Sequence, residues 1–537
     1  MIQGTTVYEA FEATAGAYPA RPMLCVTPST ASAYGIEASE IPYDEASARV
    51  AELAQTYRDA GFGEGMRIGL LLENRPEFFI HFLAINSLGA SALPINPDLR
   101  AAELEYLIGH AEPALIVALP DRHQMLASAT QAAGVTLEVV AHGAPLPLPR
   151  ADAVVAEPKT GEAREAAVLY TSGTTGQPKG CVLPNSYFLQ CGRWYSTTGG
   201  LCEITEAAEE RMITPLPLFH MNAMACSFMA MVAVGGCLIA LDRFHPSTWW
   251  KDVAESRATC LHYLGVMPTM LMGAEPSPDD RAHSVRFGFG AGIDPKLHAP
   301  FEERFGIPLV EAWAMTETGN GAVIAANAPG ERLVGVSCLG KPSDHVEVRI
   351  LADDGTQADH GELLVRAAGD DPRYGFFSHY YKNAEATAEA WDGGWFHTGD
   401  IVRRDAEGYV YFVDRKKNVI RRSGENIAAV EVESVLMRHP AITAAGVAAV
   451  PDEVRGDEVF ACLVVDAPSP SLAEEIAAWC QDQMAYYKAP AYIAFVDALP
   501  LTGTQKIQRG ELKALAVRLV DDPGTAQLGH FKKRSAA

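Results

Sequence analysis

The stretch YTSGTTGQPKG, residues 170–180, begins at the end of the apolar run AAVLY, residues 166–170. A buried strand that feeds a Gly-rich turn is the place where α/β proteins hold ligands. A Walker loop is excluded, because it needs a lysine and a hydroxyl directly after its second glycine, whereas Gln177 and Pro178 separate Gly176 from Lys179. The order therefore predicts an α/β protein with a different kind of phosphate-binding loop.

The polar side chains of this stretch are suited to an anion. Hydroxyl groups donate hydrogen bonds to phosphate oxygens, and an ammonium group adds positive charge. Pro178 removes an amide donor and opposes a helix, so we predict a mobile, hydroxyl-rich lid. The candidate donors are Thr171, Ser172, Thr174, Thr175 and Lys179. A solvated surface turn is the alternative.

The composition limits the partners that the protein can have. The chain has 537 residues, too many for one core, and a formal charge of −24. This charge argues against nucleic acid and against an anionic membrane surface. The ten cysteines form no CxxC pair, so we expect reduced thiols in a cytoplasmic protein. The first residues lack the basic and apolar regions of a secretory signal.

One apolar segment is nearly long enough to cross a bilayer. It runs from Ala223 to Leu241 and contains no charged residue. Gly235 and Gly236 divide it, however, into a piece of helix length and the strand-like piece CLIAL. We therefore predict a buried helix and a buried strand, without stable membrane insertion.

Alternating apolar runs and helical patterns predict the fold class, which is α/β with a large N-terminal lobe of doubly wound sheets. The expected elements include strands at 67–72, 90–95, 114–118 and 137–141, a helix at 75–88, and further alternation between 212 and 310. A β-rich subdomain follows from about 346, and a small α+β C-terminal domain follows 415. In that domain Val432, Val435, Leu436 and His439 are predicted to share a helix face. The end, GHFKKRSAA, predicts a frayed tail.

Seven further motifs follow the opening stretch in order. They are PLFH at 217–220, GAG at 290–292, WAMTE at 313–317, HTGD at 397–400, DRKKN at 414–418, SGENI at 423–427 and TQKIQR at 504–509. Together with TSGTTGQPKG, they resemble the ATP-dependent acyl-adenylate-forming (AMP-binding) family, which includes acyl-CoA synthetases, adenylation domains and luciferases. The resemblance implies an AMP-binding domain at 1–413, a hinge at 414–418 and a mobile C-terminal domain at 419–537.

The resemblance assigns most of these motifs to ATP. When a carboxylate is joined to AMP, two anions meet at one phosphorus, which needs a metal ion and fixed cations. In WAMTE the family places the aromatic ring beside adenine, the threonine on the α-phosphate and the glutamate on Mg²⁺, here Trp313, Thr316 and Glu317. Asp400 and Arg415 are assigned to the ribose. The remaining implied ATP contacts are Gly173, Gly176, Gly290, Ala291, Gly292, Ala314 and Met315.

The family uses two faces of the C-terminal domain for two half-reactions. Lys506 matches the catalytic lysine of adenylation, which bridges the substrate carboxylate and the α-phosphate. The domain then turns about a hinge lysine, here Lys417, so that the loop Ser423, Gly424 and Glu425 lines the pantetheine tunnel of CoA. A glycine at 424 would let the backbone approach pantetheine closely. The chain departs from the family at Gln505, where glycine is usual, and at Trp313-Ala314, where Tyr-Gly is usual.

The resemblance places the acid behind His220, a catalytic candidate that the family uses as a gate. By the same analogy the pocket is lined by Met221, Asn222, Met224 and Met267, and methionines adapt to varied ligands. The combination of VDR and GEN resembles the crotonobetaine/carnitine-CoA ligase branch. We expect no carboxylate near His220 that could hold a trimethylammonium group. Trp249 and Trp250 are candidates for that cation, although a core role is favoured.

The leading hypothesis is an acid:CoA ligase that forms acyl-AMP and pyrophosphate, and then acyl-CoA and AMP. ATP and CoA are its substrates, Mg²⁺ is its cofactor, and a small or medium, polar or carnitine-like carboxylic acid is the third substrate. Two alternatives stay open, namely an adenylating enzyme that loads a carrier protein and a nucleotide-binding scaffold with a degenerate site. A homodimer also stays open.

Overall fold

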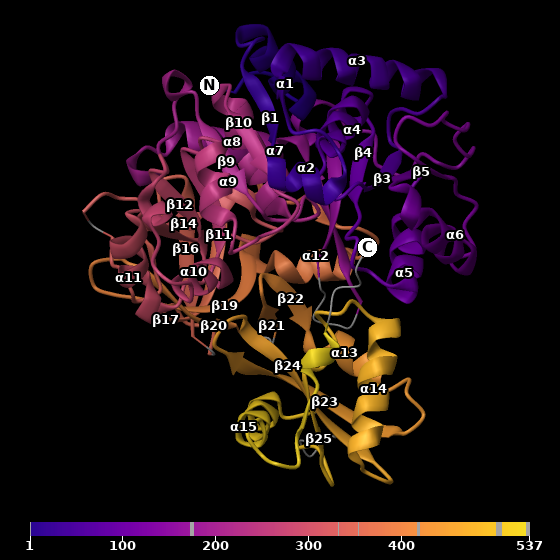
Figure 1. Ribbon diagram of the computed structural model, residues 1–537, viewed down its shortest axis with the longest axis vertical. Coiled ribbons are helices and arrows are strands. Elements are labelled where there is room, and N and C mark those ends of the chain that lie inside the picture. The colour runs from indigo at the N-terminus through magenta and orange to yellow at the C-terminus, as the bar shows by residue number, and fades with distance from the viewer. Residues whose placement is uncertain are drawn as a thin grey trace.

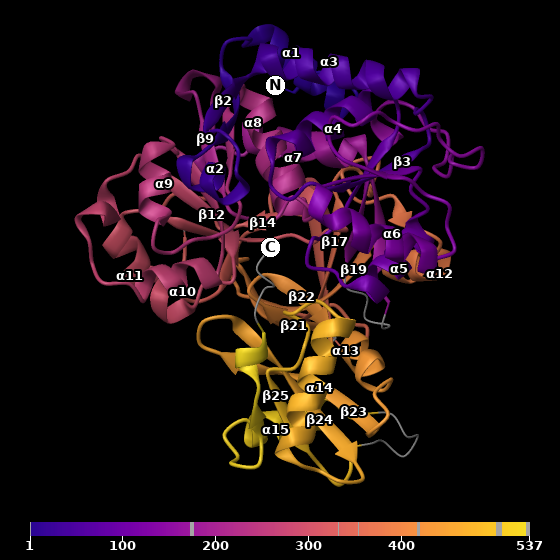
Figure 2. The same ribbon diagram turned by 45° about the vertical axis from the view of Figure 1, so that its right-hand side comes forward.

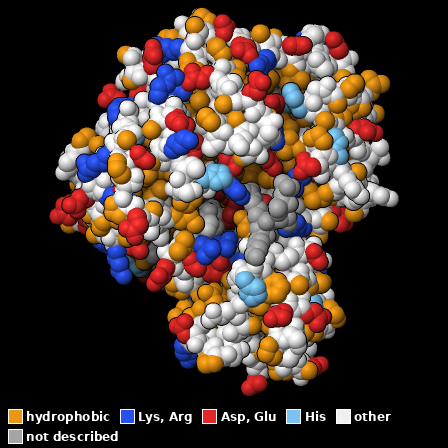
Figure 3. Space-filling view, viewed as in Figure 1, with side chains coloured by type: hydrophobic (Ala, Val, Ile, Leu, Met, Phe, Trp, Pro, Cys, Tyr) orange, Lys and Arg blue, Asp and Glu red, His pale blue; other side chains and the backbone are white. Residues whose placement is uncertain are grey.

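The computed structural model describes residues 2–171, 177–330, 332–352, 354–415, 419–500 and 507–532. Figures 1 and 2 show a large lobe with a small orange and yellow domain against one side of it. This architecture confirms the predicted α/β lobe with a separate α+β domain. On the face shown in Figure 3, acidic and basic side chains are interspersed over both parts, so the charge is spread rather than gathered.

The first sheet of the large lobe carries the opening stretch. Its strand order is β18-β8-β7-β4-β3-β5-β6, and β7 pairs antiparallel with β8, a strand that the sequence did not predict. The strands are β3 (Arg67–Leu71), β4 (Ser91–Pro94), β5 (Leu115–Ala118), β6 (Val139–Val140), β7 (Glu165–Thr171), β8 (Lys179–Pro184) and β18 (His379–Tyr380). The helices of this part are α3 (Tyr43–Asp59), α4 (Pro76–Ser87), α5 (Ala101–Ala111) and α6 (His123–Ala132).

The second sheet has the order β14-β13-β12-β11-β9-β10-β1-β2 and is parallel from β13 to β1. Its strands are β1 (Pro22–Val26), β2 (Ser39–Pro42), β9 (Arg211–Thr214), β10 (Cys237–Ala240), β11 (Cys260–Leu264), β12 (Phe287–Ala291), β13 (Leu309–Trp313) and β14 (Ile324–Ala325). The accompanying helices are α1 (Val7–Ala17), α2 (Pro28–Tyr34), α7 (Asn185–Thr197), α8 (Phe228–Val234), α9 (Trp249–Glu255), α10 (Val266–Met272) and α11 (Pro295–Phe305). One hydrophobic core joins both sheets, with Phe79 of α4 stacked on Phe228 of α8.

The long apolar segment folds as predicted. A π-helical turn over Asn222–Ser227 continues into α8, which ends at Gly235 in the left-handed conformation. The piece CLIAL then forms β10 inside the parallel sheet. Within the described residues, the helices all fall short of the length and apolarity that a bilayer span requires.

The β-rich subdomain is a five-stranded antiparallel sheet with the order β15-β20-β19-β17-β16. Its strands are β15 (Cys338–Gly340), β16 (Val346–Leu351), β17 (His360–Ala367), β19 (Phe396–Arg404) and β20 (Val410–Arg415), and α12 (Ala384–Ala390) lies between β18 and β19 in the chain. This sheet brings HTGD, on β19, beside the start of DRKKN, because Asp400 and Arg415 are partners in the strand register.

The small domain is a mixed sheet of β21 (Val419–Arg422), β22 (Glu425–Ala428), β23 (Ile442–Asp452), β24 (Gly456–Val465), β25 (Tyr492–Phe495) and β26 (Ala526–Gln527). Its helices are α13 (Ala429–Leu436), α14 (Pro470–Gln483) and α15 (Arg509–Leu519). Two apolar clusters of its own fill it. The division into three domain segments, including a hinge at 414–418, stays a prediction.

Two predictions for the small domain were wrong. The helix α13 ends at Leu436, so His439 lies beyond it and instead meets Trp479 edge-on. The predicted frayed tail was wrong for residues 529–532, because Lys532 is buried and forms an ion pair with Glu458. Glu458 also accepts from the Arg422 guanidinium, and sequence reading cannot foresee a buried carboxylate that gathers two distant cations.

Candidate functional site

Three parallel strands of the second sheet end at one edge. Strands β11, β12 and β13 end at Leu264, Ala291 and Trp313, and this edge of a parallel sheet is where α/β proteins bind ligands. The Gly265 N–H donates to the carbonyl of Ala291 at 3.0 Å. A side chain at Gly265 would collide with the backbone of Gly292, which explains the glycine there. The fold therefore brings GAG and WAMTE together.

The adenine and ribose candidates are in direct contact. Trp313 donates its indole N–H to Oδ2 of Asp400 at 2.8 Å, and both side chains are buried. The strand register places Arg415 opposite Asp400, although the side chain of Arg415 lies outside the described residues. Trp313 thus replaces the family's tyrosine with a donor that fixes a carboxylate beside the predicted ribose position.

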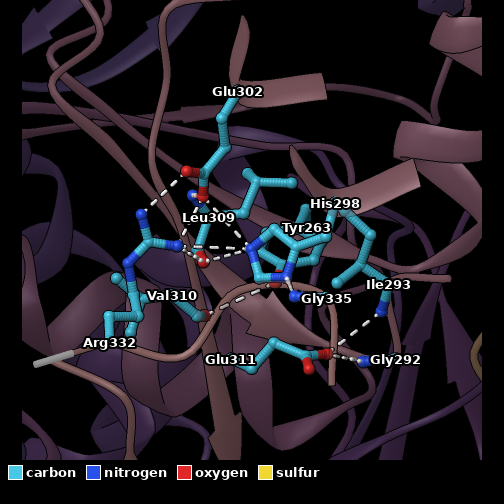
Figure 4. A network of polar contacts seen from close by, with 10 residues as sticks. All are labelled: Tyr263, Gly292, Ile293, His298, Glu302, Leu309, Val310, Glu311, Arg332 and Gly335. Atoms are coloured by element: carbon cyan, nitrogen blue, oxygen red, sulfur yellow. Dashed lines mark hydrogen bonds and ion pairs between the residues drawn. The ribbon is translucent and has the colours of Figure 1, made fainter. Parts of the chain in front are cut away.

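Glu311, which the sequence analysis did not single out, holds the end of the GAG turn (Figure 4). Its Oε1 accepts the N–H groups of Gly292 at 3.1 Å and Ile293 at 3.2 Å. Burial raises the pKa of Glu311, while the nearby His298 charge and these two N–H donors act to lower it. In the same figure, Glu302 forms a separate pair with Arg332. Glu311 therefore fixes the end of the turn that the resemblance assigns to ATP.

Removing the Glu311 carboxylate, which accepts these two hydrogen bonds, should specifically weaken the binding of ATP. Because two buried N–H donors lose a charged partner, Glu311→Leu is expected to raise the KM for ATP about tenfold. Both N–H groups go to one oxygen, so Glu311→Gln should restore most of the affinity. Steady-state kinetics at varied ATP measures this. Glu302→Gln is the control, which is expected to lower the melting temperature and to leave the KM for ATP unchanged. A KM for ATP in Glu311→Leu equal to that of the unmodified enzyme would contradict the assignment.

The opening stretch joins two antiparallel strands, β7 ending at Thr171 and β8 beginning at Lys179. The predicted phosphate contacts Ser172, Gly173, Thr174, Thr175 and Gly176 lie outside the described residues. At the far side of the stretch, Tyr106 donates its hydroxyl to the carbonyl of Pro178 at 2.9 Å. The Lys179 ammonium lies 4.6 Å from the ring centroid of Tyr380. The lysine is therefore held over an aromatic face.

Glu317 is the carboxylate that the resemblance gives to Mg²⁺. It is buried, and its Oε1 accepts the hydroxyl of Tyr380 at 2.8 Å, while Thr316 beside it is half-buried. Among residues that the structure describes, no three His, Cys, Asp or Glu side chains gather as a metal cluster. Mg²⁺ is usually bound by one or two carboxylates together with substrate phosphates, so a single carboxylate fits a metal that arrives with ATP.

His220 has a carboxylate partner, which corrects the sequence expectation. Its Nε2 lies 3.2 Å from Oε2 of Glu425, the last residue of the predicted CoA loop. The two residues are far apart in sequence and in different domains, so no local pattern could have shown the contact. The His220 imidazole is about one third exposed, at 38%, and Glu425 is less exposed at 19%. The predicted gate residue and the predicted CoA loop are thus in contact.

The four predicted pocket residues follow His220 or lie on α10. Met224 and Met267 are buried, and Met221 and Asn222 are half-buried. Asn222 Oδ1 lies 2.6 Å from Nδ1 of His262, a residue that the sequence analysis missed. Burial lowers the pKa of His262 to about 3, so this ring is neutral and its Nδ1–H donates to the amide oxygen. The amide of Asn222 is therefore fixed in one orientation.

The candidate cation site at the tryptophans is not supported by their positions. Trp249 is buried in the core, and Trp250 stacks with His283 and contacts Phe305. The core role that the sequence favoured is therefore confirmed for Trp249, while Trp250 is half-buried and packs against the core. All ten cysteines are buried and free.

The small domain meets the large lobe through the predicted CoA loop. A Cβ added at Gly424, whose φ is +91°, would lie 2.2 Å from Cδ1 of Leu264. Figures 1 and 2 show the β21–β22 hairpin nearest the large lobe and α15 at the opposite end of the small domain. Lys506, the predicted catalytic lysine of adenylation, lies outside the described residues, and so does Lys417, the predicted hinge residue.

A second contact holds the same orientation. Lys488, buried in the small domain, lies 2.5 Å from Oε1 of Glu103 on α5 and 2.7 Å from Oε1 of Glu431. Burial lowers the pKa of Lys488, but the carboxylates of Glu431 and Glu103 outweigh burial and raise it above its ordinary value. Asn96 also donates its amide to the hydroxyl of Tyr487 at 3.1 Å. In this orientation the predicted CoA loop therefore lies against His220.

Comparison with known proteins gives two family matches. The profile described as AMP-binding enzyme matches residues 11–375, and that of the AMP-binding enzyme C-terminal domain matches residues 431–506. A sulfoacetate–CoA ligase of Cupriavidus necator is 32% identical over 475 residues, which cover 86% of this chain and 89% of that protein. A crotonobetaine/carnitine–CoA ligase of Salmonella arizonae is 29% identical over 492 residues, covering 89% of this chain and 94% of that protein.

Solved structures share the fold over most of the chain. A malonyl-CoA ligase in a ternary product complex with methylmalonyl-CoA and AMP is 26% identical with a TM-score of 0.72, covering 89% of this chain and 96% of that chain. An o-succinylbenzoate CoA synthetase variant from Bacillus subtilis has a TM-score of 0.79 at 23% identity, and the match covers 95% of this chain and 99% of that chain. At that identity the second match shows the fold alone.

Proposed function

The chain belongs to the AMP-binding enzyme family and is an AMP-forming acyl-CoA synthetase, and on that premise we propose that it joins a short, polar carboxylic acid to free coenzyme A. The contact between His220 and Glu425 carries the proposal, because it sets the predicted CoA loop against the predicted acyl gate. ATP and CoA are the other two substrates.

In the first half-reaction we assign the adenosine end of ATP to Trp313, Asp400 and the Gly290–Gly292 turn. Their contacts with one another and with Glu311 support a preformed adenosine site. Glu317 would hold Mg²⁺, which supplies positive charge where the phosphates of ATP meet the carboxylate. Lys179 would face the leaving pyrophosphate, while Thr316 and Lys506 would face the α-phosphate.

In the second half-reaction the CoA thiol attacks the acyl carbonyl, and AMP leaves. The proposed path runs past Ser423, Gly424 and Glu425, whose loop lies at the edge where β11 ends. Glu425 would orient the His220 imidazole beside the acyl group. The ion pair between Lys488 and Glu103 would hold the small domain in this orientation.

The proposed acid carries a second polar group near its carboxylate. The fixed amide of Asn222 favours a hydrogen-bonding end, and the flexible side chains of Met221, Met224 and Met267 would adapt to a short carbon chain. The names of the relatives agree, because sulfoacetate, carnitine and malonate each carry a second polar or charged group beside the carboxylate. The rings of Trp249 and Trp250 lie against protein, whereas the carboxylate of Glu425 lies beside His220, so the proposal names a polar second group and leaves its charge to the product assay.

Product analysis tests this function. The enzyme is incubated with ATP, Mg²⁺, CoA and a panel containing sulfoacetate, malonate, crotonobetaine and butyrate, and AMP and CoA thioesters are quantified. Equal amounts of AMP and thioester with malonate or sulfoacetate, and less with butyrate, support the proposal. Pyrophosphate without thioester until a phosphopantetheinyl carrier protein is added would favour the carrier-loading alternative. Absence of both products would favour the scaffold.

A further inference from the structure

We propose that Tyr380 is a positioning residue that keeps the carboxylate of Glu317 and the ammonium of Lys179 apart and ready for ATP. The inference rests on the proposed function, because it takes the roles of these two charged groups from it. Tyr380 lies outside the motifs that mark the site in the sequence, in the segment HYY at residues 379–381. Its place became apparent only from the fold.

The phenol of Tyr380 contacts both charged groups with different parts of the ring. Its hydroxyl donates to Oε1 of Glu317 at 2.8 Å. The ammonium of Lys179 lies 4.6 Å from the ring centroid, within the range of a cation–π interaction. Tyr380 and Glu317 are each only 7% exposed, so these contacts form away from bulk water. One side chain therefore addresses the carboxylate and the ammonium at once.

The backbone around Tyr380 fixes this placement from two sides. Strand β18 pairs antiparallel with β8, the strand that Lys179 begins, and Tyr380 is the register partner of Cys181. On the other side, the N–H of Phe377 donates to the main-chain carbonyl of Glu317 at 2.8 Å. The chain thus ties the segment before Tyr380 to Glu317 and Tyr380 itself to the strand of Lys179.

The electrostatic reason for such a spacer is direct. An ammonium and a carboxylate that contact the same side chain attract one another, and the attraction is strong where water is scarce. If they paired, Lys179 would be lost to the phosphates and Glu317 to the metal that accompanies them. Both residues are described, and the charged group of each contacts Tyr380, with no ion pair between the two. The phenol gives each charge a neutral partner instead, which ATP can replace at little cost.

Measurements of ATP affinity distinguish this role of Tyr380 from a merely structural one. Isothermal titration calorimetry is performed with ATP in Mg²⁺ and with ATP in EDTA, on unmodified enzyme, Tyr380→Phe and Tyr380→Leu. Tyr381→Phe is the matched control, because the neighbouring tyrosine donates its hydroxyl to Glu112 instead, at 2.9 Å. Melting temperatures of all variants establish that each is folded.

We expect Tyr380→Phe, which loses only the hydroxyl, to bind ATP about tenfold more weakly in Mg²⁺ and equally well in EDTA. Tyr380→Leu, which also loses the ring, should weaken ATP binding in EDTA as well, because Lys179 is then free to pair with Glu317. Tyr381→Phe should bind ATP with the same affinity as the unmodified enzyme, both in Mg²⁺ and in EDTA.

Equal affinity of Tyr380→Phe and unmodified enzyme for ATP in Mg²⁺ would overturn the inference, as would an equal loss in Mg²⁺ and EDTA. The proposed function is tested separately, since calorimetry with ATP requires neither the acid nor CoA. An enzyme that makes no thioester but shows the expected Mg²⁺-specific loss would refute the ligase proposal and leave the role of Tyr380 standing.

Discussion

Replacing Lys506 by alanine is expected to abolish formation of the acyl-adenylate and to spare thioester formation from supplied acyl-adenylate. The ammonium is the fixed cation proposed at the α-phosphate while charge shifts there, and removing one such electrostatic contact costs about a hundredfold to a thousandfold in rate. In the proposed second half-reaction the small domain presents the loop of Glu425 to His220 instead, so we expect the lysine to have no part in that step. Pyrophosphate release measures the first step, and CoA thioester from purified acyl-AMP measures the second.

Lys513→Ala is the matched control for this prediction. Lys513 is another lysine of the small domain, on α15, and its removal should change neither half-reaction more than about twofold. If Lys506→Ala slowed both half-reactions to the same degree, the assignment of the lysine to adenylation alone would be wrong.

Replacing Gly424 by leucine is expected to have the opposite effect, with loss of thioester formation and retention of adenylation. A side chain at this position meets Leu264 of the large lobe at 2.2 Å already at its Cβ. Overpacking of this size costs about 1–3 kcal/mol, which corresponds to roughly fivefold to 150-fold in the population of the thioester-forming orientation. The rate of CoA thioester formation from acyl-AMP should fall by that factor, while pyrophosphate release is unchanged.

Gly408→Leu separates this clash from backbone strain. Gly408 has nearly the same φ, +88° against +91°, but a Cβ there has nothing within 4 Å. Both variants therefore carry the strain of a left-handed residue, and only Gly424→Leu adds the collision between domains. An equal loss of thioester formation in the two variants would show that strain alone is responsible.

The local elements of the fold were predictable because their signals are local. Alternation of apolar runs gave β3, α4, β4 and β5 within a residue or two, and the glycine pair separated α8 from β10. Pairing between distant strands was not predictable in this way. The parallel pair of β1 and β10, and the antiparallel pair of β7 and β8, depend on tertiary packing that no run of residues encodes.

The candidate site shows the same difference between residues that local sequence patterns reveal and residues that only the fold reveals. Glycines and hydroxyls in fixed order identify the motifs, and the fold brings Trp313 and Asp400 together as the resemblance implies. The residues that hold those motifs, such as Glu311 and Tyr380, stand outside any pattern because their partners come from other strands. The carboxylate beside His220 was missed for a further reason, since it belongs to a domain whose orientation the sequence does not state.

The central claim is that one orientation of the small domain serves thioester formation and another serves adenylation. It is tested most directly by locking the orientation described here. Cysteines in place of Asn96 and Tyr487, whose polar atoms are 3.1 Å apart, can be joined by a short bis-methanethiosulfonate, which forms one reducible disulfide with each thiol and releases a sulfinate each time. The ten native cysteines are buried. Single-cysteine variants treated in the same way are the controls.

The two half-reactions of the cross-linked enzyme give the answer. The account predicts that it still forms thioester from acyl-AMP and CoA, that it no longer releases pyrophosphate from ATP and acid, and that reduction of the cross-link restores this release. Full pyrophosphate release from an enzyme that stays cross-linked would contradict the account, because adenylation would then proceed with the CoA loop still against His220.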